Sequence, residues 1–378
     1  MATLTKPQRA IQPLLQGARG YRKHLGQYGA GGRSSVNDKT VAVFGATGFL
    51  GRYVTNQLEG RLTGTRCFIP HRGCEMDVRR TKVQFDLGQV VFPFYSSYDE
   101  QSMRDAIGNA DTVVNLIGKH YETKHLCFTR KEDGAINRVN SSFKNVNVDV
   151  AGMLARAAKA QGVKNFVHVS ALAADPDSPS RWAQTKFAGE LAVKEAFPEA
   201  TIVRPAKLFG NSDRLLTWIA LMATRMGRVP LVNDGDNLIQ PIDARNVAQV
   251  LMAIIDDPEN LDYRGKLVEL AGPAEFSWRE VADLVLDTTH RARVTDVEGM
   301  SMLFARGYGM LLEQLPNPLF TEDEALAMSV DVVLKPNPDA LTLEDFNITN
   351  PFKMEECAIS IVRRFRTVQH FGFVKGYH

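Results

Sequence analysis

The chain has few cysteines, almost no net charge and no long apolar run, and each shortage excludes a class of protein. Its 378 residues include four cysteines, whose positions show neither the spacing of a metal site nor a paired framework, which fits a reducing compartment. A formal net charge of +2 gives no electrostatic reason to expect a nucleic acid partner. The apolar runs fall well short of the roughly 18 to 20 residues that span a bilayer. The sequence therefore predicts a globular protein that does not cross a membrane by itself.

Acidic residues are missing from the first 37 positions, and Asp38 is the first carboxylate of the chain. The same stretch has no long apolar core and carries six basic residues: Lys6, Arg9, Arg19, Arg22, Lys23 and Arg33. A basic segment free of acids is typical of mitochondrial targeting and not of secretion. We therefore expect residues 1–37 to form a targeting or interaction arm. The alternative is a disordered basic tail.

From Lys39 onward, apolar runs typical of strands alternate with amphipathic stretches typical of helices. We expect strands at residues 41–44, 66–70, 89–94, 112–117, 165–170 and 201–204. The helices between them are expected to end near 58 and to span 99–108, 148–161 and 182–196. Such alternation predicts βαβ units and a parallel sheet. The fold class is therefore α/β, with a Rossmann-type doubly wound sheet over residues 38–215.

Residues 216–378 are less regular and are expected to form a smaller, mixed C-terminal domain with an irregular extension. Short strands are expected at 229–231 and 237–242 and helices at 247–255 and 278–286, the last capped by Ser277. Residues near 240–271 are the part of this region expected to pack back on the main sheet. Prolines at 316, 318, 336 and 338 predict extended pieces near the end of the chain.

A glycine-rich turn directly follows the first apolar run. Gly45, Gly48 and Gly51 stand between the strand expected at 41–44 and the helix that follows it. Gly45 permits a tight turn, Gly48 leaves the backbone open to a pyrophosphate, and Gly51 lets the helix pack close to the strand. The helix N-terminus then offers free N–H groups and a partial positive charge to phosphates. This spacing, in this context, predicts a dinucleotide site.

Arg72 follows the second expected strand, where the ribose of such a nucleotide would lie. An acidic residue there binds the 2′-hydroxyl of NAD, whereas an arginine accommodates the 2′-phosphate of NADP. The residue therefore predicts NADPH (NADP) as the cofactor. The alternative is a solvated arginine at a strand end.

Six motifs occur in the order found in an extended short-chain dehydrogenase/reductase, and the resemblance covers about residues 38–275. They are Gly45 to Gly51, Asn115 to Gly118, Asn147-Val148, Lys186, Arg204 to Gly210 and Gln240 to Ala248. Within that superfamily, the runs Gly31 to Val36 and Val43 to Val54 resemble the nucleotide-binding accessory subunits of mitochondrial respiratory complex I. The likeness extends over Pro70 to Arg72, Asp86 to Gln89 and Val114 to Gly118.

Active members of the superfamily use a Tyr-x-x-x-Lys pair, in which the tyrosine exchanges a proton during hydride transfer and the lysine holds the ribose. This chain has Trp182 and Lys186 at that spacing, and an indole N–H has no useful acidity near neutral pH. Ala171 falls near the position of the substrate-orienting Ser or Thr, and Ser170 precedes it by one residue. The sequence therefore predicts a chain that holds a nucleotide without using it. The alternative places the missing tyrosine at Tyr121.

The turn and the resemblance together give eleven candidate cofactor-binding residues, with no catalytic and no metal-binding residue. The candidates are Gly45, Thr47, Gly48, Phe49, Leu50, Gly51, Arg72, Ile117, Gly118, Lys186 and Leu208.

The resemblance implies a non-catalytic accessory subunit of mitochondrial NADH:ubiquinone oxidoreductase (complex I), with NADPH as a structural cofactor for assembly and stability. It implies other complex I subunits as partners, a peripheral position on the matrix side of the inner membrane, and no self-contained homo-oligomer. The apolar residues 300–315 fit an amphipathic helix against a membrane or partner, and fit core packing equally well. Two other functions fit the sequence: an active NADP-dependent atypical reductase or epimerase, and an NADPH-sensing binding protein. Turnover would distinguish the enzyme from the other two.

Overall fold

A computed structural model describes residues 37, 39–62, 64–86, 88–122, 127–130, 136–139, 141–256, 263–292, 295–315 and 318–366. The predicted N-terminal arm, residues 1–37, lies outside the described residues apart from Asn37.

The centre of the described structure is an eight-stranded sheet in which every neighbouring pair is parallel. Its order from edge to edge is β16-β13-β8-β7-β4-β1-β2-β3. The strands are β1 (Thr40–Phe44), β2 (Arg66–Phe68), β3 (Val90–Val91), β4 (Thr112–Asn115), β7 (Asn165–Val169), β8 (Thr201–Pro205), β13 (Leu267–Leu270) and β16 (Ala340–Leu341). The order reverses between β1 and β4, the kind of switch point at which doubly wound folds bind ligands. The predicted α/β fold with a Rossmann-type parallel sheet is confirmed.

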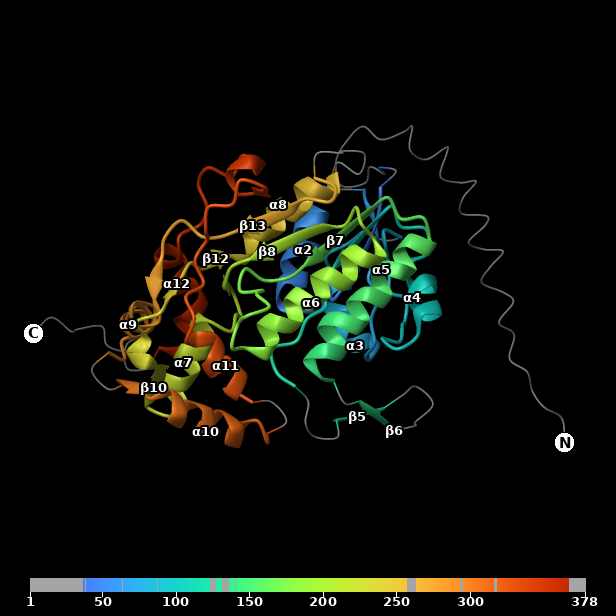
Figure 1. Ribbon diagram of the computed structural model, residues 1–378. Helices are drawn as coiled ribbons and strands as arrows, with labels where there is room; N and C mark the ends of the chain where they lie inside the picture. Colours follow the sequence, from blue (N-terminus) through green and yellow to red (C-terminus); the bar gives the residue numbers. More distant parts are fainter. Residues whose placement is uncertain are drawn as a thin grey trace, which may run out of the picture.

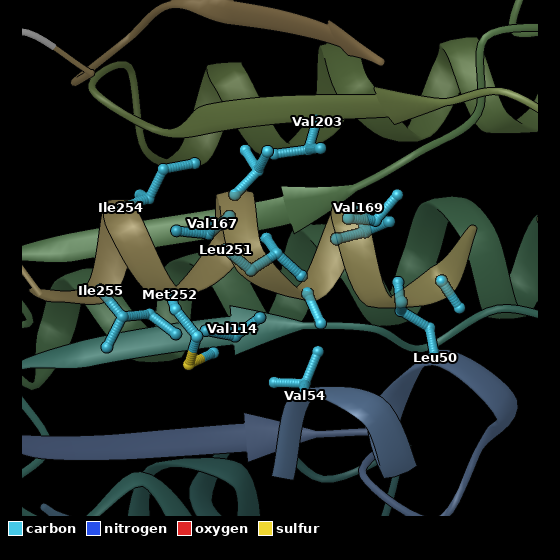
Figure 2. Packing of buried hydrophobic residues seen from close by; sticks show 14 of the residues in the cluster. Leu50, Val54, Val114, Val167, Val169, Val203, Leu251, Met252, Ile254 and Ile255 are labelled. Carbon is cyan, nitrogen blue, oxygen red and sulfur yellow. The ribbon is translucent and has the colours of Figure 1, made fainter. Parts of the chain in front are cut away.

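Helices cover both faces of the sheet because successive strand side chains point to opposite faces. Val41, Val43 and Val114 belong to one buried cluster, together with residues of α2 and α8 (Figure 2). Ala42 and Phe44 belong to a second cluster, on the face covered by α4, α5 and α6. The bounds of these helices are α2 (Phe49–Arg61), α4 (Glu100–Ile107), α5 (Val150–Ala160), α6 (Arg181–Ala196) and α8 (Ala244–Asp256). The apolar alternation in the sequence thus explains the layered architecture.

A second lobe with its own buried cluster lies beside the carboxyl edge of the sheet (Figure 1). It is built from α7 (Leu216–Arg225), α9 (Trp278–Thr289), α10 (Met302–Leu312), α11 (Glu322–Met328), α12 (Met354–Val362) and the parallel pair of β10 (Arg228–Val232) with β15 (Asp296–Met300). Ser277 caps α9 in a capping box, as the sequence predicts. Three further strand pairs are β9 (Leu208–Phe209) with β12 (Ile242–Asp243), β11 (Leu238–Ile239) with β14 (Phe276–Ser277), and β5 (Cys127–Arg130) with β6 (Ile136–Val139). The short helices are η1 (Lys144–Asp149), a π-helix, and the 3-10 turns η2 (Asn233–Gly235), η3 (Glu344–Phe346) and η4 (Arg363–Phe365).

Four helices are missing from the sequence prediction, and one of them is α7 (Leu216–Arg225). The helix α3 (Glu75–Lys82) is strongly polar and buries only Val78 and Thr81, so no apolar periodicity marks it. The expectation of extended pieces near the end of the chain was wrong for α11 and α12, because the prolines stand before and between these helices and not inside them.

Late parts of the chain return to the main sheet. β13 pairs with β8, which confirms the expectation for that segment, and β16 extends the same sheet by one more strand. Leu343 and Phe346 also join the cluster formed by α2 and α8. Because later segments join the main sheet, the domain boundary at residue 215 remains a prediction. None of the helices among the described residues is both long and apolar enough to cross a bilayer.

Candidate nucleotide site

The glycine turn runs from the carboxyl end of β1 into α2. Gly45 has a φ of +83°, in the left-handed region that favours glycine. The Gly48 N–H donates to the Gly45 carbonyl at 3.0 Å, and Gly48 is the N-cap of α2. This helix has no acidic residue in its first turn, and Gly48 has no side chain that could cap it. The N–H groups of the first turn, which include those of Phe49, Leu50 and Gly51, are therefore the donors available to a phosphate.

Side chains would not fit at two of the turn glycines. A Cβ at Gly45 would lie 2.9 Å from the carbonyl carbon of Leu116, in the segment after β4. A Cβ at Gly51 would lie 2.5 Å from the carbonyl oxygens of both Gly45 and Ala46. Gly51 therefore lets the helix approach the turn itself, directly after the strand. At Gly48 the nearest atom to a Cβ is the Gly45 oxygen, at 3.1 Å.

The segment after β4 lies beside this turn and carries Ile117 and Gly118. The Asn115 side chain fixes its start, because its Oδ1 accepts from the Ile117 N–H at 3.0 Å. A Cβ at Gly118 would lie 3.1 Å from the Lys186 Nζ. The structure therefore brings together Gly118 and Lys186, two candidates that are far apart in the sequence.

Lys186 is a buried lysine on α6, with 6% of its surface exposed. Desolvation lowers the pKa of Lys186 to about 8, and the nearby carboxylate of Glu190 offsets only part of that effect. Glu190 is itself occupied, since Arg204 donates to both of its carboxylate oxygens. Among the described residues, Lys186 forms no hydrogen bond and no ion pair. Buried lysines are rarely left unpaired, so this ammonium is available to a ligand.

Three buried polar atoms on β7, just after it and on α6 also lack partners in the described structure: His168 Nε2, Ser170 Oγ and Trp182 Nε1. His168 contacts Asn115 through its Nδ1 at 3.0 Å, and desolvation followed by the charge of Lys186 lowers the pKa of His168 to about 3. Its ring is therefore neutral. A buried donor or acceptor without a partner costs about 1–3 kcal/mol. These atoms, together with the ammonium, fit the polar nicotinamide and ribose end of a dinucleotide.

Trp182 occupies the first turn of α6, one turn before Lys186. Its ring stacks on His120, with the centroids 6.3 Å apart. Desolvation, followed by the charges of Arg214, Lys207 and Lys186, lowers the pKa of His120. The side chain of His120 is solvent-exposed, which weakens the desolvation effect, but the three cations act in the same direction and the imidazole is neutral. The aromatic neighbour of Trp182 is therefore His120, while Tyr121 lies against the Lys119 ammonium at 5.1 Å.

Arg72 lies just beyond the carboxyl end of β2 and is exposed. Its Nη1 donates to the Ser97 Oγ at 2.9 Å, and its charge partly offsets the burial that raises the pKa of Tyr95. No local pattern in the sequence indicates this anchor on Ser97, because the two residues meet only through the pairing of neighbouring segments. One guanidinium N–H is engaged in the bond, which leaves the others free to pair with a phosphate.

Leu208 lies on β9, and the residues that follow it contact the start of α2. The Asn211 N–H donates to the Tyr53 Oη at 2.6 Å, and Phe49 lies edge-on to Tyr53 at 5.4 Å. Leu208 itself packs against the cluster formed by α2 and α8. The segment after β8 and the glycine turn after β1 therefore both lie at the carboxyl edge of the sheet.

Asp323 is a functional neighbour that sequence reasoning missed. It lies on α11 and is buried, and its carboxylate accepts from Ser180 Oγ at 2.8 Å, Arg181 N–H at 2.6 Å and Trp182 N–H at 3.2 Å. Burial raises the pKa of Asp323, and these hydrogen bonds offset part of that effect. The last hundred residues therefore support the start of α6, whose N-cap is Ser180, although the sequence showed no chemistry there. The Thr321-x-x-Glu324 capping pattern could have revealed α11, but not its partner.

Comparisons with known proteins identify relatives of this chain. The model of the RmlD substrate binding domain matches residues 124–303. The chain is 34% identical over 353 residues to NADH dehydrogenase (ubiquinone) 1 alpha subcomplex subunit 9, mitochondrial, of Arabidopsis thaliana, an alignment that covers 91% of this chain and 82% of that protein. It is 34% identical over 343 residues to the Mus musculus protein of the same name, with 90% and 84% covered. A dTDP-glucose 4,6-dehydratase from Streptomyces venezuelae, solved with NAD, superposes with a TM-score of 0.61 at 16% identity, over 88% of this chain and 98% of that one.

The parallel sheet, the glycine turn at its switch point and the buried Lys186 define a protein of the Rossmann-type dinucleotide-binding class. The solved neighbour supports that fold. More particularly, the chain belongs to the family of NADH dehydrogenase (ubiquinone) 1 alpha subcomplex subunit 9, mitochondrial, as the identity to the plant and mouse proteins over most of its length shows.

Proposed function

We propose that this chain is a non-catalytic accessory subunit of mitochondrial complex I, and that it holds NADPH as a structural cofactor for assembly and stability. Its plant and mouse relatives carry the name of a mitochondrial NADH dehydrogenase subunit, which supports the other complex I subunits as its partners. We place it on the matrix side of the inner membrane, as a peripheral protein within the complex and not as a self-contained homo-oligomer.

The observation that carries the non-catalytic part is Trp182 at the place of the proton-exchanging tyrosine. The indole N–H cannot act as an acid near neutral pH, and loss of general acid catalysis typically costs about 10²- to 10⁴-fold in rate. His120, which stacks on this ring, is neutral and equally unsuited to donate a proton. Lys186 persists without the tyrosine, so its use is in holding the cofactor.

The residues present fit NADPH. The N–H groups at the start of α2 would bind the pyrophosphate, Arg72 would pair with the 2′-phosphate, and Lys186 would hold the ribose beside Ile117 and Gly118. When bound, NADPH supplies hydride chemistry, for which this chain offers no proton donor. What it adds here is stability, because a ligand that binds only the folded state contributes RT ln(1 + [L]/Kd), roughly 4 kcal/mol at a thousandfold excess over Kd.

An exposed apolar face supports docking within an assembly. The helix α10 and the residue that follows it by three positions present large apolar side chains to solvent: Leu303, Phe304, Met310, Leu311 and Leu315. Leu303 is 83% exposed. Contiguous exposed apolar residues of this kind mark sites of protein or membrane contact. We assign this face to contacts within the complex, at or near the membrane surface.

The decisive experiment is native mass spectrometry of complex I, isolated with this chain, followed by analysis of the nucleotide it releases. We expect one NADP(H) for each copy of the chain, with no NAD(H) at that site. Steady NADPH oxidation by the isolated chain would favour the atypical reductase or epimerase instead. Recovery of the chain free in the soluble matrix would favour the NADPH sensor.

A further inference from the structure

We propose that the outer side of β3 is a docking site for an extended, uncharged segment of another protein chain, which pairs with it as one more strand of the main sheet. We call residues 90–94 the β3 edge. β3 is the last strand in the order of the main sheet and pairs with β2. Among the described residues, no strand lies on its other side. The inference rests on the proposed function in one respect, because the partner is sought within complex I.

Main-chain groups of the β3 edge face away from the rest of the sheet. The carbonyls of Gln89, Val91 and Pro93 accept from β2 and the residues that follow it, at 2.8, 2.9 and 3.0 Å. Neighbouring residues of a strand direct their N–H and C=O groups to opposite sides. The residues that face outward are therefore Val90, Phe92 and Phe94. Their main-chain groups have no hydrogen-bond partner in the part of the chain that the structure describes.

Pro93 does not protect this edge. A proline blocks an incoming strand only where its missing N–H would face that strand. The Pro93 carbonyl bonds toward the sheet, so its nitrogen faces the sheet as well. The outward row of donors is therefore complete.

Charged side chains are also missing from the β3 edge. Residues 88–98 include no Asp, Glu, Lys or Arg, whereas natural sheets commonly protect their edges with charges, Lys above all. Val91 is 51% exposed and Phe94 is 57% exposed. Val90 and Phe92 pack against the cluster formed by α2 and α8, so alternation places Val91 on the opposite face of the strand. The edge thus combines unpaired main-chain groups with exposed apolar side chains.

This combination identifies the chemistry of the partner. Outward-facing groups recur every second residue, at about 6.6 Å along the strand, and another extended backbone matches that spacing. In docking of this kind, main-chain bonds give affinity and alternate side chains give selectivity. A charge on the partner would be buried beside Val91 or Phe94 without a counter-charge, which is costly. The partner segment is therefore extended and apolar.

The length of the edge favours a subunit of an assembly over a second copy of this chain. Five residues extend over about 17 Å, and two such edges bury far less than the roughly 1,200–2,000 Å² of a stable interface. A segment that other contacts already hold nearby needs no such area, because its effective concentration is high. The plant and mouse relatives carry the name of a subunit of NADH dehydrogenase, which fits a partner of that kind.

Hydrogen exchange resolved to single amides tests the pairing. The full-length chain, purified by itself, is compared with complex I isolated with this chain. We expect the amides of Phe92 and Phe94 to exchange quickly in the free chain and at least about tenfold more slowly in the complex. The internal control is the Tyr95 amide, which donates to the His71 carbonyl at 3.0 Å and should exchange slowly in both.

Val91→Lys should reduce incorporation into complex I about tenfold relative to the parent chain expressed in the same cells, because pairing would bury an unpaired ammonium. Val91→Ile should be incorporated like the parent. The matched control is Leu191→Lys, at a position on α6 that is 55% exposed, which should also be incorporated normally. Phe94→Lys has the same expectation as Val91→Lys and replaces it if that variant fails to fold.

The outcomes separate this inference from the proposed function. Rapid exchange of Phe92 and Phe94 within the complex, or normal incorporation of both lysine variants at the β3 edge, overturns the inference and leaves the function standing. Slow exchange in the free chain also overturns it: loss of that protection on dilution means a second copy, and its persistence in the monomer means that the chain covers its own edge. A chain that does not purify with complex I counts against the proposed function.

Discussion

At the scale of single residues, we expect the exposed guanidinium of Arg72 to decide which nucleotide the site prefers. Its bond to Ser97 holds it at the end of β2, and charge-assisted hydrogen bonds contribute about 1.5–3 kcal/mol. We therefore expect Arg72→Ala to weaken NADPH binding by about 10- to 100-fold and to change NADH binding little. Fluorescence titration with both nucleotides measures this.

Arg79→Ala is the matched control for Arg72, because Arg79 is an exposed arginine on the neighbouring helix α3. It should leave both affinities unchanged. Equal affinity for NADPH and NADH, before and after the change at Arg72, would mean that the 2′-phosphate is not read at this position.

The second prediction is that the protein does not oxidise NADPH, because Trp182 stands at the place of the tyrosine. Trp182→Tyr restores the phenol but not the rest of the machinery, since Ala171 occupies the place near which an orienting hydroxyl is expected. We expect no steady NADPH oxidation by either protein, measured by absorbance with small carbonyl compounds. Oxidation that disappears when Tyr121 or Lys186 is changed would establish an active reductase.

Lys186 gives the third prediction, a dependence of cofactor affinity on pH. Since the pKa of Lys186 in the protein without cofactor is about 8, the ammonium is charged below that pH and neutral above it. A charged lysine binds the ribose oxygens more strongly than an amine does. NADPH affinity should therefore fall as pH rises from 7 to 9. In Lys186→Met the affinity should be lower and should not change over this range; an unaltered decline would assign the titration to another group.

At the scale of elements, α11 holds the helix that carries Trp182 and Lys186. Asp323 accepts hydrogen bonds from the hydroxyl of Ser180, the N-cap of α6, and from the N–H groups of Arg181 and Trp182. Loss of a capping interaction costs about 0.5–2 kcal/mol. Asp323→Ala should therefore lower the melting temperature by about 2 °C or more and weaken NADPH binding, because the first turns of α6 loosen. Calorimetry and nucleotide titration provide the two readouts.

The control for Asp323 is Asp339→Ala, which removes an exposed carboxylate from the same C-terminal region. It should change neither quantity. A lower melting temperature with an unchanged NADPH affinity would show that the cap supports the fold without positioning the site.

The elements also show which parts of the fold can be predicted from the sequence. The strands of the sheet other than β16, the glycine turn and the capped helix at Ser277 were predictable, because apolar alternation, glycine spacing and capping are local signals. The helix α3 was not, since its polar sequence buries only two side chains. The contacts of Arg72 with Ser97 and of Asp323 with α6 join residues that only the fold brings together. Lys186 was predicted from its spacing, whereas its desolvation follows from packing.

At the scale of the whole molecule, the cofactor is expected to affect assembly and not the electron transfer of assembled particles. Gly48→Val would place side-chain atoms where the backbone approaches the pyrophosphate, since a Cβ already meets the Gly45 oxygen at 3.1 Å. We expect an empty site and less assembled complex I on native gels. NADH oxidation normalised to that abundance should stay unchanged. Full assembly with an empty site would refute a structural role for NADPH.

The position of β16 means that the main sheet is completed late in synthesis. Ribosomes release residues 340 and 341 after nearly all of the sheet, yet these residues cover the outer edge of β13. Until then that edge offers unpaired N–H and C=O groups to any passing strand, and the places of Leu343 and Phe346 in the core stay unfilled. A nascent or truncated chain can therefore form the glycine turn early and still present an open sheet edge. A strand that is synthesised late, β16, thus protects the edge of β13 from pairing with other chains.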